Sequence, residues 1–135
     1  MHNNHQDQRR HAARDAQSTV QPLRTRTKSF ALRIIKLYRS LPRTTDAQVI
    51  GKQLLRSGTS VGANYREGHR ARSDAEMLAK FGICLQELDE SSYWMELLIE
   101  SELVKPSALT PLIDETDQLI AIFTASVKRI ATGER

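Results

Sequence analysis

Apolar side chains recur at steps of three and four residues in four successive segments, and the breaks between these segments are short. This spacing places apolar residues on one face of an α-helix, so it predicts four helices. The first expected helix runs from Thr27 to Leu41, and Pro42 ends it because the residue before a proline is pushed out of the α region. Helices joined by such short turns run antiparallel to their sequence neighbours. We therefore expect an all-α, antiparallel up-down four-helix bundle.

Capping patterns mark the starts of the second and third helices. Thr45-x-x-Gln48 and Ser73-x-x-Glu76 both fit the capping box, in which two side chains satisfy free N–H groups of a first helical turn. The second helix is expected to end at Gly68. The sequence therefore predicts two long helices separated by a short basic turn.

Prolines limit the last helix. The third helix is expected to extend to about Val104, before Lys-Pro-Ser breaks it. The fourth helix is expected to begin between Ser107 and Pro111, because proline is tolerated in a first turn, and to end near Thr132. These limits predict one bundle domain over residues 27–132.

Charge divides the chain into three parts. Residues 1–26 are polar and basic without apolar periodicity, so we expect a disordered basic tail. Residues 29–72 hold nine Lys/Arg and two acids, or +7, and residues 73–135 hold five and twelve, or −7. We expect no secretory signal and no membrane span, and the lone cysteine, Cys84, fits a cytoplasmic location.

Residues 58–62, GTSVG, fit the G-x-S-x-G pattern that surrounds the nucleophilic serine of many hydrolases. The preceding residues read as helix rather than as the required strand, and no histidine follows His69. We therefore interpret Gly51, Gly58 and Gly62 as one small-residue side of a helix, which lets a neighbouring helix approach closely. Each glycine costs about 0.5–1 kcal/mol relative to alanine, so a compensating contact is expected.

A polar line follows the same helix and has two interpretations. It is either a solvated face or a buried hydrogen-bond network that reaches the third helix, with Arg72 as a counter-charge. The expected network residues are Ser57, Ser60, Asn64, Glu67, Arg72 and Glu87.

The segment QLLRSGTSVGANYREGHRARS, followed by AEMLAKFGICLQELDESSYWMELL, resembles the bacterial four-helix-bundle family first noticed as proteins encoded within intervening sequences of 23S rRNA genes. The similarity covers about residues 28–132. The matching motif residues are Arg56, Ser57, Ser60, Asn64, Glu67, Gly68, Arg72 and Ser73, with Glu87-Leu88 in the next helix. The resemblance implies ring-shaped homopentamers. In one branch, an accessory of a reverse transcriptase, it also implies a basic surface that binds nucleic acid.

The sequence offers no catalytic constellation. All four histidines precede the third helix, and none follows a glutamate by three residues as the di-metal bundle sites require. Cys84 lies in an apolar stretch and reads as a core residue. We therefore expect no enzyme, no metal, no cofactor and no small-molecule substrate.

Two non-enzymatic functions remain open. The first is an assembly or accessory module, a homo-oligomer whose apolar side chains outside the main stripes, Ile35, Ile83, Tyr93, Trp94 and Leu97, contact neighbouring copies. The second is sequence-nonspecific binding of RNA or DNA through basic residues of the first two helices. The expected nucleic-acid-binding residues are Lys52, Arg56, Arg66, Arg70, Arg39 and Arg43.

Overall fold

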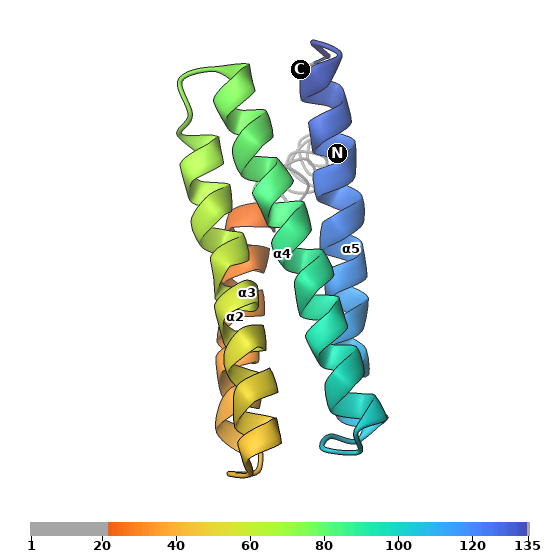
Figure 1. Cartoon of the computed structure of the whole chain (residues 1–135). Helices are drawn as coiled ribbons and strands as arrows, with labels where there is room; N and C mark the ends of the chain where they lie inside the picture. The colour runs from red at the N-terminus through yellow and green to blue at the C-terminus, as the bar shows by residue number, and fades with distance from the viewer. Residues whose placement is uncertain (1–21, 135) are drawn as a thin grey trace, which may run out of the picture.

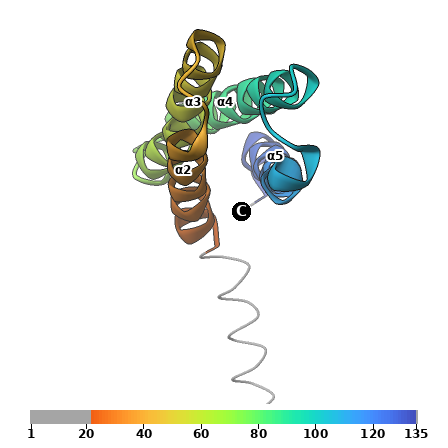
Figure 2. The same ribbon diagram turned by 90° about the horizontal axis from the view of Figure 1, so that it is seen from below.

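The computed structural model describes residues 22–134, and four helices fill this range. They are α2 (Pro22–Ser40), α3 (Thr45–His69), α4 (Asp74–Glu100) and α5 (Pro106–Ala131). Each runs antiparallel to the one before it (Figure 1). Seen along the bundle, the helices occupy four corners, with α2 diagonal to α4 (Figure 2). The predicted up-down four-helix bundle is confirmed.

The first helix begins at Pro22, earlier than the expected Thr27. Residues 22–26 therefore belong to the bundle rather than to the tail. Proline suits a first helical turn because its missing N–H has no partner there. Leu23 packs partly against the core, and Arg26 pairs with Glu115 on α5, which anchors this extra turn. The remainder of the expected tail, residues 1–21, lies outside the described residues.

The two capping boxes have different outcomes. The Ser73 hydroxyl accepts the N–H of Glu76 at 3.2 Å, as predicted. The box at Thr45 is wrong: the N-cap of α3 is Thr44, without a side-chain cap bond. Gln48 instead joins the α2–α3 turn, because its amide oxygen accepts from the Tyr38 hydroxyl at 2.9 Å and its amide nitrogen donates to the Pro42 carbonyl.

The α4–α5 turn differs from the expectation at both ends. Helix α4 ends at Glu100 rather than near Val104, because Glu102 takes a left-handed conformation with φ 62° and Leu103 donates back to the Leu98 carbonyl at 3.0 Å. Helix α5 starts at Pro106, before the expected range, and Pro111 stands inside it. Only one helical hydrogen bond is lost to Pro111, close to the helix start.

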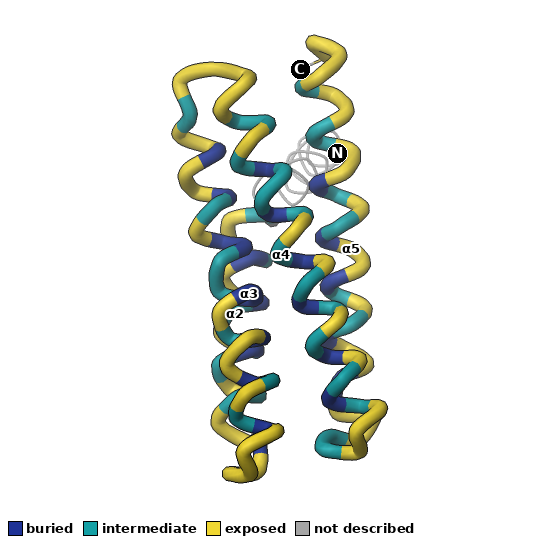
Figure 3. The backbone as a smooth tube through the Cα atoms, in the orientation of Figure 1, coloured by how far each residue is buried: buried dark blue, intermediate teal, exposed yellow. Residues whose placement is uncertain are grey.

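Residues from all four helices form one aliphatic core with a small aromatic cluster at one end (Figure 3). Phe81 contacts Phe123 edge-on at 5.5 Å between ring centroids, and Tyr65 stacks on Phe81 at 5.8 Å. The remaining large buried side chains are mainly leucine, isoleucine, valine and methionine. The low aromatic content of the sequence matches this mainly aliphatic interior.

Glycines on α3 allow close packing against α2, as the sequence predicted. A Cβ added at Gly58 would lie 2.8 Å from Ile34 Cγ1, and one at Gly51 would lie 2.5 Å from Leu41 Cδ1. Gly62 faces the backbone and side chain of Thr27. The segment around Ser60 is continuous helix. The G-x-S-x-G pattern therefore serves helix packing and does not form a nucleophile elbow.

Candidate interaction surfaces

The basic stripe predicted on α3 is divided by the structure. Lys52, Arg66 and Arg70 are exposed on the side of α3 that faces away from the core, and no salt bridge reaches them from elsewhere in residues 22–134. Arg56 differs, because its guanidinium pairs with Glu87 at 3.3 Å and with Glu90 on α4. Three of the four stripe residues therefore leave their charge available to a partner.

The pairing of Arg56 also changes the titration of its partner. The hydrogen bond from Arg56 is the main cause that lowers the pKa of Glu90, and the same bond raises the pKa of Arg56. Glu90 also accepts the indole N–H of Trp94 at 3.2 Å. Both charged groups are largely solvated, so water screens the attraction. The sequence did not predict this pair, since Arg72 was the expected counter-charge.

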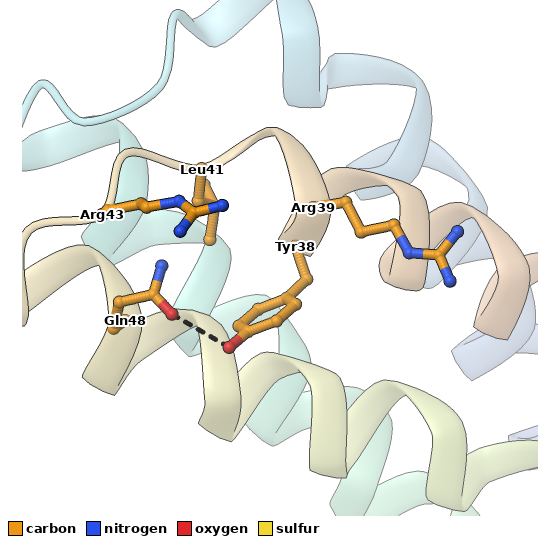
Figure 4. A pocket seen from close by; sticks show the side chains of 5 residues that line it. All are labelled: Tyr38, Arg39, Leu41, Arg43 and Gln48. Atoms are coloured by element: carbon orange, nitrogen blue, oxygen red, sulfur yellow. Dashed lines mark hydrogen bonds between the residues drawn. The ribbon is translucent and has the colours of Figure 1, made fainter.

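Arg39 and Arg43 lie at the α2–α3 turn, around an open pocket of about 470 Å³ that Tyr38, Leu41 and Gln48 complete. Arg43 extends across this pocket, while Arg39 points away from the Tyr38–Gln48 hydrogen bond (Figure 4). The two guanidinium groups therefore do not converge on one anion. They add positive charge to this end of the bundle.

A groove between α2 and α3 brings together two cations that the sequence did not pair. Lys28 and Arg66 line it, and its other residues are small or hydroxyl-bearing: Thr27, Ala31, Thr59, Gly62 and Ala63. The groove has a volume of about 410 Å³. The contact between Gly62 and Thr27 holds the two helices close at this point, so it also sets the separation of the cations. That glycine was the sequence signal for this surface.

The six expected network residues do not form one network. The Ser57 and Ser91 hydroxyls meet at 2.8 Å in the buried α3–α4 interface, and Ser91 also donates to the Glu87 carbonyl. Ser60 donates to the Arg56 carbonyl within α3.

The other members make separate local contacts near the surface. Asn64 donates to the Ser60 carbonyl at 2.9 Å, and Glu67 pairs with Lys80 at 2.7 Å. Arg72 is exposed and donates its backbone N–H to Glu76. Only Ser57 is fully buried among the expected hydrogen-bonding residues of α3, so the hydrogen bond that joins the two helices inside the core is the one to Ser91.

Apolar side chains remain on the outer side of α4 after the core is filled. Tyr93 is 52% exposed, its ring lies 5.0 Å from that of Trp94, and Ile83 and Leu97 are half-buried. On α2, Leu32 is 56% exposed and Ile35 is half-buried. These residues include all five that the sequence left without a place in the bundle core.

Cys84 is a core residue. Its thiol donates to the Val61 carbonyl at 3.4 Å, and burial raises its pKa to about 12. The thiol is therefore neutral near pH 7 and a poor nucleophile. Within residues 22–134 no cluster of three or more His, Cys, Asp or Glu side chains is arranged to hold a metal ion. None of the described helices is long and apolar enough to cross a membrane.

Comparison with known proteins places this bundle. No curated protein matches the sequence. A crystal structure of a protein of unknown function from the S23 ribosomal protein family of Bacteroides thetaiotaomicron is similar, with 34% identity and a TM-score of 0.77. The match covers 82% of this chain and 98% of that one. The family model described as 23S rRNA-intervening sequence protein matches residues 23–125, and the chain belongs to this family.

Proposed function

We propose that the protein is a non-catalytic assembly or accessory module that works as a closed homo-oligomeric ring. The observation that carries this proposal is the outer side of α4, where Tyr93 and Leu97 continue an apolar surface on a helix whose opposite side fills the core. A helix that is apolar all round is normally buried on all sides. A second copy of the chain would supply the missing cover.

The family supports this proposal through its architecture. The resemblance implies homopentamers, and this chain has the same four-helix bundle as its structural relative. Clustered exposed apolar residues mark protein–protein contacts more often than isolated ones do. The paired rings of Tyr93 and Trp94 are residue types enriched in interface cores.

Light scattering coupled to size-exclusion chromatography tests the ring. We expect one species with a mass several times the 15.3 kDa of a single chain, unchanged over a wide range of protein concentration. A closed ring has no free interface, so its mass does not grow with concentration. A monomer would contradict the proposal, and a mass that rises steadily with concentration would contradict closure.

A second candidate function is sequence-nonspecific binding of RNA or DNA. It is favoured by the exposed cations Lys52, Arg66 and Arg70, and by the groove in which Lys28 lies beside Arg66. Phosphate contacts of this kind give affinity that falls steeply with salt, by a slope of about 0.9 for each phosphate neutralised in duplex DNA. Among the stripe residues, Arg56 contributes least in this proposal because Glu87 and Glu90 already neutralise it.

Fluorescence anisotropy with labelled RNA and DNA at two salt concentrations tests this second function. We expect binding at low salt that Arg66→Glu together with Arg70→Glu abolishes. The matched control is Arg56→Gln, which removes a cation from the same helix and should leave most of the affinity. Flat anisotropy at low salt, or equal losses from both variants, would remove the basic stripe as a nucleic-acid surface.

A further inference from the structure

Helix α2 has an outer face that the bundle does not use. Leu32 is 56% exposed and Ile35 is half-buried on the side of the helix opposite the buried Phe30 and Ile34. Three exposed cations surround these two aliphatic side chains: Lys28, Lys36 and Arg39. No salt bridge to these cations forms within the described range. We call these five residues the α2 face.

Helix α4 has an outer face of opposite charge. Tyr93 and Leu97 lie there with three exposed carboxylates that no salt bridge reaches within residues 22–134: Asp89, Glu96 and Glu100. Glu90 does not belong to this set, because Arg56 and Trp94 hold its carboxylate. We call Asp89, Tyr93, Glu96, Leu97 and Glu100 the α4 face.

The two faces match in chemistry. Each has two large apolar side chains at its centre and three charged groups around them, cations on α2 and carboxylates on α4. Opposite charges at the rim of an interface orient the partners and suppress contacts between identical faces. Two α2 faces would bring like charges together, and so would two α4 faces. The pairing of α2 with α4 is therefore the one that the charges favour.

The two faces cannot meet within one chain. Helices α2 and α4 stand at diagonal corners of the bundle, and their outer sides point in opposite directions (Figure 2). They run in the same direction, and their middles lie at one level. Ile34 contacts Gly58 on α3, and the next residue, Ser57, bonds Ser91 on α4. Two bundles set side by side would bring the α2 face of one to the α4 face of the other at this level.

We infer that the α2 face of one copy docks on the α4 face of the next, an inference that rests on the proposed ring. The contact joins two different surfaces, so every copy in a closed ring uses both faces once. Helix α3 stands between α2 and α4 in the bundle and takes no part in the contact. Its exposed cations, Lys52, Arg66 and Arg70, therefore repeat around the ring and remain open to solvent.

A charge exchange in the full-length chain tests the contact. One variant reverses the α2 face with Lys36→Glu and Arg39→Glu, and a second reverses the α4 face with Glu96→Lys and Glu100→Lys. Each reversal places like charges across the interface, so each variant should be a monomer by light scattering. A third variant with all four substitutions restores opposite charges and should regain the wild-type mass. Circular dichroism checks that all three remain helical.

The control is Lys52→Glu with Arg70→Glu, which reverses two exposed cations of α3 outside both faces and should leave the mass unchanged. If the wild type is a monomer, the proposed ring itself fails. If the wild type assembles but the two reversed variants keep its mass, the ring stands and the pairing of these faces is wrong. If both reversals dissociate the ring and their combination does not restore it, the faces do not meet each other, and the inference is overturned.

Discussion

At the scale of single residues, the α3 glycines show how the removal of a side chain can be stabilising. Glycine inside a helix costs conformational entropy, yet Gly58 sits 2.8 Å, measured from a built Cβ, from Ile34 Cγ1. Ile34 is branched at Cβ and cannot move aside easily. Gly82 on α4 provides the contrast, because nothing lies within 4 Å of a Cβ built there.

The two glycines therefore respond to alanine in opposite ways. We expect Gly58→Ala to lower the free energy of unfolding by about 1–3 kcal/mol, through overpacking against α2. We expect Gly82→Ala to raise it by about 0.5–1 kcal/mol, through helix propensity alone. Thermal or urea unfolding at one fixed protein concentration measures both. Equal shifts in the same direction would show that Gly58 is not a packing residue.

The buried thiol of Cys84 makes stability depend on pH. Its pKa in the folded protein is about 12, raised mainly by burial from an ordinary value of 9.0. Folding therefore favours the neutral thiol, and this contribution is fully present below pH 9 and is lost as pH rises toward 12. We expect Cys84→Ala to show a flatter loss of stability between pH 9 and 11 than the wild type. Parallel curves for the two proteins would contradict this assignment.

At the scale of helices, the chain relies on turns whose geometry the sequence only partly reveals. Glu102 takes a φ of 62° after α4, a conformation that glycine adopts without strain. We expect Glu102→Gly to raise the free energy of unfolding by about 0.4–1 kcal/mol, since the observed backbone suits glycine better than glutamate. A urea titration compares the two proteins. A lower midpoint for the variant would mean that the glutamate side chain contributes more than the strain costs.

The sequence predicted the helices well because three- and four-residue periodicity is a local property. The cap at Ser73 was predictable for the same reason, as were the α3 glycines, whose spacing alone indicated a close neighbour. The cap at Thr45 was not, because Gln48 bonds to Tyr38 and Pro42 on the other side of a turn. Local patterns fail where a side chain finds a better partner in another element.

The surfaces were less predictable than the helices, for a related reason. Lys52, Arg56, Arg66 and Arg70 share a stripe in sequence, but only the packing of α3 on α4 shows that Glu87 and Glu90 occupy Arg56. The groove at Lys28 needs the contact of Gly62 with α2. Charge spacing gives the side of a helix. It does not give the charges on the helix that packs beside it.

At the scale of the whole molecule, the separation of charge along the chain acquires a spatial meaning. The basic half folds into α2 and α3, and the acidic half folds into α4 and α5. Within one bundle this brings opposite charges together at Arg26–Glu115 and at Arg56 with its two glutamates. The charges that remain lie on opposite outer sides. Such a molecule is polar across its width, which favours head-to-tail contact between copies.

The outer side of α4 is the surface on which this account depends. Native mass spectrometry of the wild type beside a variant with Tyr93→Lys and Leu97→Lys tests it most directly. We predict a multiple of the single-chain mass for the wild type and 15.3 kDa, within the mass change of the substitutions, for a variant that remains fully helical. The same oligomeric mass for both proteins, or a monomeric wild type, would contradict the claim that this surface joins copies of the chain.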